Sequence, residues 1–61
     1  MKNIKEILLQ RDNLSEKEAD DLIREARDQM DRYLQRGDID SAYHICEEYF
    51  GLEPDYITQL M

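Results

Sequence analysis

The segment Ile45–Met61 contains the feature that most constrains the fold, a glycine followed closely by the only proline of the chain. Gly51 follows a helical pattern, and glycine accepts the left-handed backbone that commonly ends a helix. Pro54 suits the first turn of a new helix, with Glu53 as an approximate cap. Two helices joined so tightly must cross at a large angle. The sequence therefore predicts a C-terminal corner that resembles a helix-turn-helix.

The helix before this corner is predicted over about residues 41–49, with Asp38 or Asp40 as its cap. Its apolar residues recur at the spacing of one helical face, and a short apolar stripe follows the proline. The first set is Ala42, Ile45, Cys46, Tyr49 and Phe50, and the second is Ile57, Leu60 and Met61. We expect both sets to face a common core.

Two further helices are predicted toward the N-terminus. A short one covers residues 3 to about 11, with Asn3 as its cap. The second begins after Ser15, which forms a capping-box pattern with Glu18, and runs to about Arg36 before Gly37. Its apolar stripe has the α-helical period and consists of Ala19, Leu22, Ile23, Ala26, Met30, Tyr33 and Leu34.

The predicted fold is a single all-α domain over residues 1–61, since so short a chain holds one core. We expect a bundle of three to four helices, in which the first helix and the C-terminal corner pack on one long central helix. The opposite face of the long helix is predicted to be solvated and crossed by i, i+4 ion pairs, with a charged docking strip as the alternative. These pairs are Asp20–Arg24, Arg24–Asp28, Asp28–Arg32 and Arg27–Asp31.

The charge distribution argues against binding of nucleic acid. The net charge is −7, and residues 37–61 contain six carboxylates and no Lys or Arg. Neutralisation of phosphates dominates affinity for DNA, so a reading helix without cations has the wrong electrostatics. We interpret the corner as structural and expect neither direct nucleic-acid binding nor binding to an anionic membrane.

The sequence predicts no catalytic, metal or cofactor site, and therefore a protein that is not an enzyme. His44 and Cys46 are the only imidazole and the only thiol, and residues two apart point to different sides of a helix. We expect Cys46 to be buried and His44 to be solvated. The longest apolar run is Ile7–Leu9, with no signal-peptide pattern, so we expect a cytoplasmic location.

The chain resembles a family of very short acidic helical proteins found in phages, prophages and other mobile elements of bacteria. The resemblance rests on the segment ICEEYFGLEPDYI, together with the capped LSEKEADDLI segment before it. It implies an accessory role in a mobile element. It implies no particular activity and no site residue.

Two functional hypotheses remain open from the sequence. The first is a non-enzymatic interaction domain that binds a protein, either a basic partner or a second copy of itself. The alternative is an acidic mimic of nucleic acid that inhibits a host DNA-binding protein. Tyrosines among carboxylates are suited to a protein-binding surface. The candidate partner-binding residues are Tyr43, Glu47, Glu48, Glu53, Asp55 and Tyr56.

Overall fold

The longest helix of the protein begins at Ser15. In the computed structural model, which describes residues 2–61, the Ser15 hydroxyl accepts the backbone N–H of Glu18, and the Glu18 carboxylate accepts that of Ser15, both at 3.1 Å. This capping box satisfies two of the backbone donors at the start of helix α2, Glu16–Gln35. The hydrogen bond to the Ser15 backbone lowers the pKa of Glu18. The predicted start of the long helix is confirmed.

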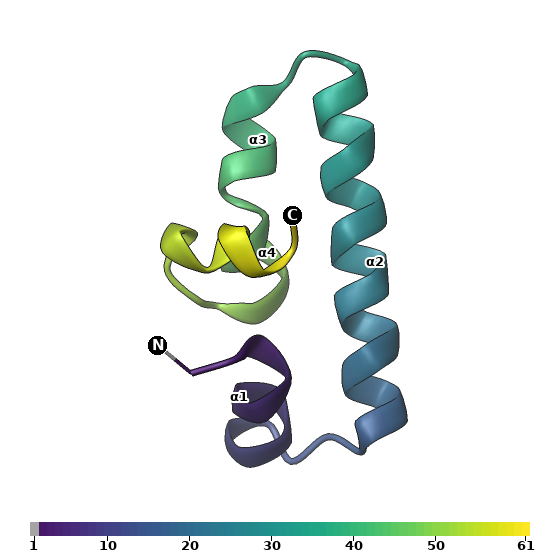
Figure 1. Cartoon of the computed structure of the whole chain (residues 1–61), viewed down its shortest axis with the longest axis vertical. Helices are drawn as coiled ribbons and strands as arrows, with labels where there is room; N and C mark the ends of the chain where they lie inside the picture. Colours follow the sequence, from purple (N-terminus) through teal and green to yellow (C-terminus); the bar gives the residue numbers. More distant parts are fainter. Residues whose placement is uncertain (1) are drawn as a thin grey trace.

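All the other helices are short. Helix α1 covers Ile4–Arg11, α3 covers Ile39–Tyr43, α4 covers Ile45–Phe50, and the 3-10 helix η1 covers Pro54–Gln59. Helices α1, α3 and α4 pack on α2, and η1 packs on α4. Figure 1 shows α1 and α3 beside opposite ends of α2, on the same side of it. Residues 2–61 thus form an all-helical fold around one long helix.

The core lies between α2 and the shorter helices. Ten apolar side chains of residues 2–61 are buried, and Leu8, Ile45, Cys46 and Leu60 are the largest of those that are fully enclosed. Every one of the four described α-helices contributes at least one buried side chain. Leu60, which follows η1, contributes another. The ten are Ile4, Leu8, Ala19, Ala26, Met30, Ala42, Ile45, Cys46, Phe50 and Leu60. Because α2 buries two alanines, the short helices can approach it closely.

Hydrogen bonds from polar side chains join the two ends of the chain. The side-chain oxygen of Gln59 accepts the backbone N–H of Ile4 at 2.8 Å, and its amide group donates to the Lys2 carbonyl. Arg11 donates to the carbonyl of Phe50 at the end of α4. Gln59 therefore satisfies one of the open backbone donors at the start of α1.

Left-handed residues end three of the helices. Gly37 follows α2 with φ = 77°, and Gly51 follows α4 with φ = 65°. Asn13 follows α1 with φ = 56°, and asparagine is one of the few residues that adopt this conformation readily. The predicted helix ends at both glycines are confirmed.

The helix predicted over residues 41–49 is instead two helices. It begins earlier, with Asp38 as its cap, and it is interrupted at His44, where the backbone has φ = −94° and ψ = 10°. No glycine or proline lies between residues 38 and 50, so no local breaker causes the interruption. The buried residues Ala42, Ile45, Cys46 and Phe50 keep the spacing of one helical face through the interruption, so the apolar pattern gives no sign of it.

The segment after the proline also differs from the prediction, because it is a 3-10 helix. It has six residues, and Glu53 makes no side-chain hydrogen bond to cap it. The 3-10 helix is usually a short connector or helix end, and six residues is a long run for it. Of the predicted stripe, Leu60 is buried and Ile57 half-buried, but the Met61 side chain is exposed.

The outer face of α2 carries a different set of ion pairs from the one predicted. Across residues 2–61, none of the four predicted i, i+4 pairs closes within 4.0 Å. Asp21 instead lies near Lys17 and Arg24, and Asp20 pairs with Lys5 of α1 at 3.2 Å. These exposed pairs contribute little to stability.

Across residues 2–61, no helix combines the length and the apolar character needed to cross a membrane.

Candidate partner-binding surface

An apolar groove lies at the end of the molecule where α2 turns into α3. Its volume is about 220 Å³, and three parts of the chain line it. Met30 and Leu34 come from α2, Ile39, Ala42 and Tyr43 from α3, and Ile57 and Met61 from the C-terminal segment. We call this set the apolar groove. No charged side chain is among its lining residues.

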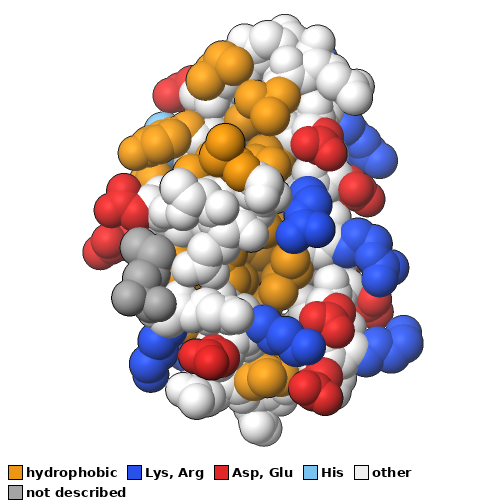
Figure 2. Space-filling view, in the orientation of Figure 1, with side chains coloured by type: hydrophobic (Ala, Val, Ile, Leu, Met, Phe, Trp, Pro, Cys, Tyr) orange, Lys and Arg blue, Asp and Glu red, His pale blue; other side chains and the backbone are white. Residues whose placement is uncertain are grey.

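Several of these side chains are exposed to an unusual degree for apolar residues. The exposed fractions are 44% for Leu34, 63% for Ile39, 46% for Tyr43 and 86% for Met61. These are the four large hydrophobic residues that are exposed among residues 2–61, and all four line the groove. In Figure 2, hydrophobic side chains gather over α3 and the adjoining end of α2, while charged side chains alternate along the rest of α2. Apolar residues collected on one surface commonly mark an interaction site.

The turn after α2 brings part of the groove together. Gly37 donates its N–H to the Leu34 carbonyl at 3.0 Å, and Asp38 donates to the Tyr33 carbonyl at 2.8 Å. These two bonds form the Schellman arrangement that reverses the chain direction. Asp38 then caps α3 by accepting the N–H of Ser41. Hydrogen bonding to the side chain of Ser41, and then to its backbone N–H, lowers the pKa of Asp38. The reversal places Ile39 and Tyr43 in the same groove as Leu34.

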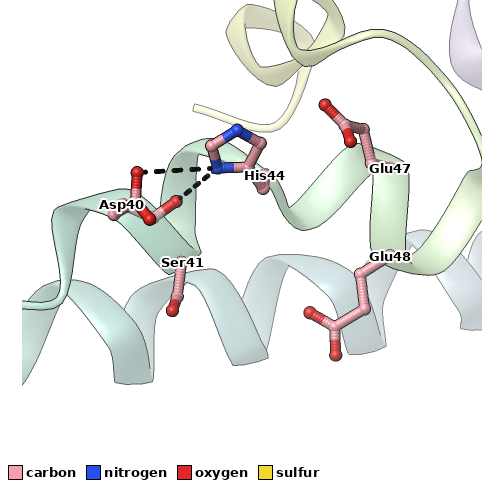
Figure 3. Close-up of a pocket in the computed structure, with 5 residues that line it drawn as sticks. All are labelled: Asp40, Ser41, His44, Glu47 and Glu48. Carbon is pink, nitrogen blue, oxygen red and sulfur yellow. Dashed lines mark hydrogen bonds and ion pairs between the residues drawn. The ribbon is translucent and has the colours of Figure 1, made fainter.

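An acidic hollow lies next to the groove, on the surface of α3 and α4. It is lined by Asp40, Ser41, His44, Glu47 and Glu48, and it contains no Lys or Arg. Figure 3 shows Asp40 directed at the imidazole of His44, with Glu47 and Glu48 extending from α4 in different directions. Glu48 also accepts the hydroxyl of Tyr33 at 3.5 Å. We call this set the acidic hollow.

His44 connects the hollow with the groove. Its Nδ1 lies 2.9 Å from the Asp40 carbonyl and 3.8 Å from the Asp40 carboxylate. The hydrogen bond to the Asp40 backbone raises the pKa of His44, and the carboxylates of Asp40 and Glu47 act in the same direction. The imidazole also meets the ring of Tyr43, a residue of the apolar groove, edge to face. The two surfaces are therefore continuous through the Tyr43–His44 contact.

The six candidate residues from the sequence are not all in one place. Glu47 and Glu48 line the acidic hollow, and Tyr43 lines the apolar groove beside it. Glu53 and Asp55 are exposed at the start of η1, and neither lines the groove or the hollow. Tyr56 is half-buried and packs against the core. The structure thus groups Tyr43, Glu47 and Glu48 in one continuous surface.

Nine of the twelve residues that line the groove and the hollow are absent from the predicted site, and four of them show why. The spacing of Leu34 and Met61 predicts a place in the core, and Asp40 is predicted as a possible cap and as one of the six carboxylates of residues 37–61. Ile39 belonged to no predicted stripe. An apolar residue with no place in the core pattern is itself a signal of exposure, and Ile39 could have been identified on that ground.

The lone thiol and imidazole lie in different surroundings, as predicted. Cys46 is fully buried in the core, and burial raises the pKa of its thiol. His44 is exposed. Among residues 2–61, no group of three or more His, Cys, Asp or Glu side chains is placed to hold a metal ion.

Comparison with known proteins identifies no relative: no family model, curated protein or solved structure matches the chain.

Proposed function

We propose that the protein is a non-enzymatic interaction domain that binds a partner protein through the apolar groove and the acidic hollow. The observation that carries this proposal is the convergence of the four exposed hydrophobic residues on a single groove. A domain of this size has little apolar surface to spare, because it already buries a smaller fraction of its chain than a large domain does. Leaving Ile39 and Met61 in water is costly for the free protein, and a partner that covers them would remove that cost.

The size of the groove favours a protein partner over a small ligand. Pockets for drug-sized molecules occupy roughly 300–1,000 Å³, whereas the apolar groove occupies about 220 Å³. This volume accommodates one or two apolar side chains. Such anchoring side chains supply most of the binding energy in many protein interfaces.

The same proposal fits the setting implied by the resemblance, an accessory protein of a phage or other mobile element. In that setting the partner would be a protein of the bacterial host or of the element itself. The C-terminal corner then serves as a support, since η1 packs on α4 and provides Ile57 for the groove.

A capture experiment with matched variants tests the proposal. Ile39→Glu places a charge at the rim of the groove, and glutamate is acceptable at the first residue of a helix. Gln10→Glu adds the same charge on α1, which lies at the opposite end of α2 (Figure 1). We expect the wild type and Gln10→Glu to retain the same bacterial protein and Ile39→Glu to lose it. Equal capture by all three would refute the proposal, provided that circular dichroism shows all three to be folded.

A second candidate function is an acidic mimic of nucleic acid. The gathering of Asp40, Glu47 and Glu48 around a hollow without Lys or Arg favours it. A mimic would bind by charge alone, so Ile39→Glu would leave its affinity unchanged or increase it. Affinity that falls steeply with salt and is indifferent to Ile39→Glu would therefore favour the mimic.

A further inference from the structure

We infer that the partner segment is an amphipathic helix with basic residues along one edge only. This inference rests on the proposed function and specifies its ligand. The apolar groove lies between α2, α3 and the C-terminal segment, and all of its lining side chains are apolar except that Tyr43 carries a hydroxyl. An amphipathic helix is a common ligand for an apolar groove, since its apolar residues at i, i+3, i+4 and i+7 share one face. One or two of these side chains would enter the groove, and the others would cover the exposed hydrophobic residues around it.

The two sides of the groove differ in charge. On the side of α3 and α4, it continues through Tyr43 and His44 to the carboxylates of Asp40, Glu47 and Glu48. On the side of α2, a neighbouring hollow contains Arg27 and Asp31, whose charges offset each other. The Arg27 side chain is also held in place, since its Nε donates to the Leu60 carbonyl at 3.2 Å. Cations on a bound helix would therefore be attracted toward α3 and α4 and not toward α2.

A second copy of the chain fits this surface less well. Each copy carries a net charge of −7, so two copies repel. A standard interface between globular proteins also involves about 20–30 residues a side, whereas this groove offers four exposed hydrophobic residues. A single helix needs less surface than a folded partner, and a basic helix is attracted by the charge that repels a second copy.

Synthetic peptides provide the probe for this inference. The first peptide has leucines at i, i+3, i+4 and i+7 over about four turns, with lysines on one edge and glutamines on the other. The second carries glutamates in place of the lysines. Binding of the fluorescein-labelled peptides to the full chain is followed by fluorescence anisotropy at about 0.15 M salt. We expect saturable binding of the lysine peptide and at least tenfold weaker binding of the glutamate peptide.

Neutralising the hollow tests where the lysines bind. The triple variant Asp40→Asn, Glu47→Gln, Glu48→Gln removes three exposed carboxylates, and we expect it to weaken binding of the lysine peptide about tenfold. The matched control neutralises three exposed carboxylates elsewhere: Glu6→Gln, Glu25→Gln and Asp28→Asn. At the same salt concentration, we expect this control to weaken binding less than about threefold, because distant charges are screened.

Several outcomes would overturn the inference. These are no saturable binding of the lysine peptide, equal affinity for both peptides, equal effects of the two triple variants, or a dimer of the free protein detected by light scattering. The proposed function would survive the first three if Ile39→Glu still lost its partner in the capture experiment. The two proposals therefore fail separately.

Discussion

The rings of Tyr43 and His44 meet edge to face, with their centroids 5.2 Å apart and their planes at 86°. Tyr43 belongs to the apolar groove and His44 to the acidic hollow. The contact occurs at the interruption between α3 and α4, where the backbone of His44 leaves helical geometry. The helix break that sequence patterns did not predict thus lies where the apolar and acidic surfaces join.

The pKa of His44 provides a first prediction. We expect an NMR titration to place it above the ordinary value of 6.5, because Nδ1–H donates to the Asp40 carbonyl and nearby carboxylates favour the charged ring. Protonated His44 then stabilises the fold. Since the folded pKa is the higher one, this contribution is complete below pH 6.5 and is lost as the pH rises through the folded value.

A variant separates the two causes of the raised His44 pKa, the backbone hydrogen bond and the nearby carboxylates. Asp40→Asn removes the carboxylate but keeps the backbone carbonyl, so we expect the pKa of His44 to fall part of the way and to remain above 6.5. A pKa at or below 6.5 in the wild type would show that the hydrogen bond is not formed in solution.

The start of α2 provides a second prediction. Ser15→Ala removes the hydroxyl that accepts the N–H of Glu18, and we expect a loss of about 1 kcal/mol in the free energy of unfolding. For a domain of this length, that loss lowers the melting temperature by roughly 4–8 °C. Ser15→Asp keeps an acceptor at the cap and serves as the control. Equal melting temperatures for the alanine and aspartate variants would contradict the capping assignment.

The turn after α4 provides a third prediction. Gly51 has φ = 65°, and a Cβ at this position would meet no atom within 4 Å. Any loss of stability caused by a side chain here therefore comes from strain in the backbone and not from steric overlap with neighbouring atoms. We expect Gly51→Val to lower the free energy of unfolding by about 2 kcal/mol, since β-branched residues tolerate the left-handed region least. Gly51→Asn should lower this free energy much less, because asparagine adopts the left-handed conformation more readily. Thermal melts followed by circular dichroism compare the two, and equal stability would exclude a left-handed turn.

Helix starts and ends could be predicted from sequence because they depend on neighbouring residues. The Asn3 and Ser15 side chains each accept a backbone N–H three positions later. Gly37 and Gly51 adopt the left-handed backbone that ends the helix before each of them. The interruption at His44 has no such local signal, because no glycine or proline lies near it and the apolar spacing continues through it. The sequence pattern therefore predicts one continuous helix at this position.

The apolar groove was missed for a related reason. Leu34 and Met61 have the spacing of core residues, yet they lie where a helix end and the C-terminal segment leave the core. Whether an apolar residue at the end of a stripe is covered depends on what packs there. The acidic half of the surface was easier to predict, because the absence of Lys and Arg after residue 36 is a property of the sequence itself.

Site-specific photo-crosslinking in bacteria tests most directly whether the apolar groove is the binding surface. Benzoylphenylalanine replaces Tyr43 in one variant and Gln10 in another, so that the probe lies in the groove or far from it on α1. We predict a covalent adduct with one protein at position 43, none at position 10, and loss of the adduct when Ile39→Glu is added. Equal adducts at both positions, or an adduct at position 43 that persists with Ile39→Glu, would contradict this account.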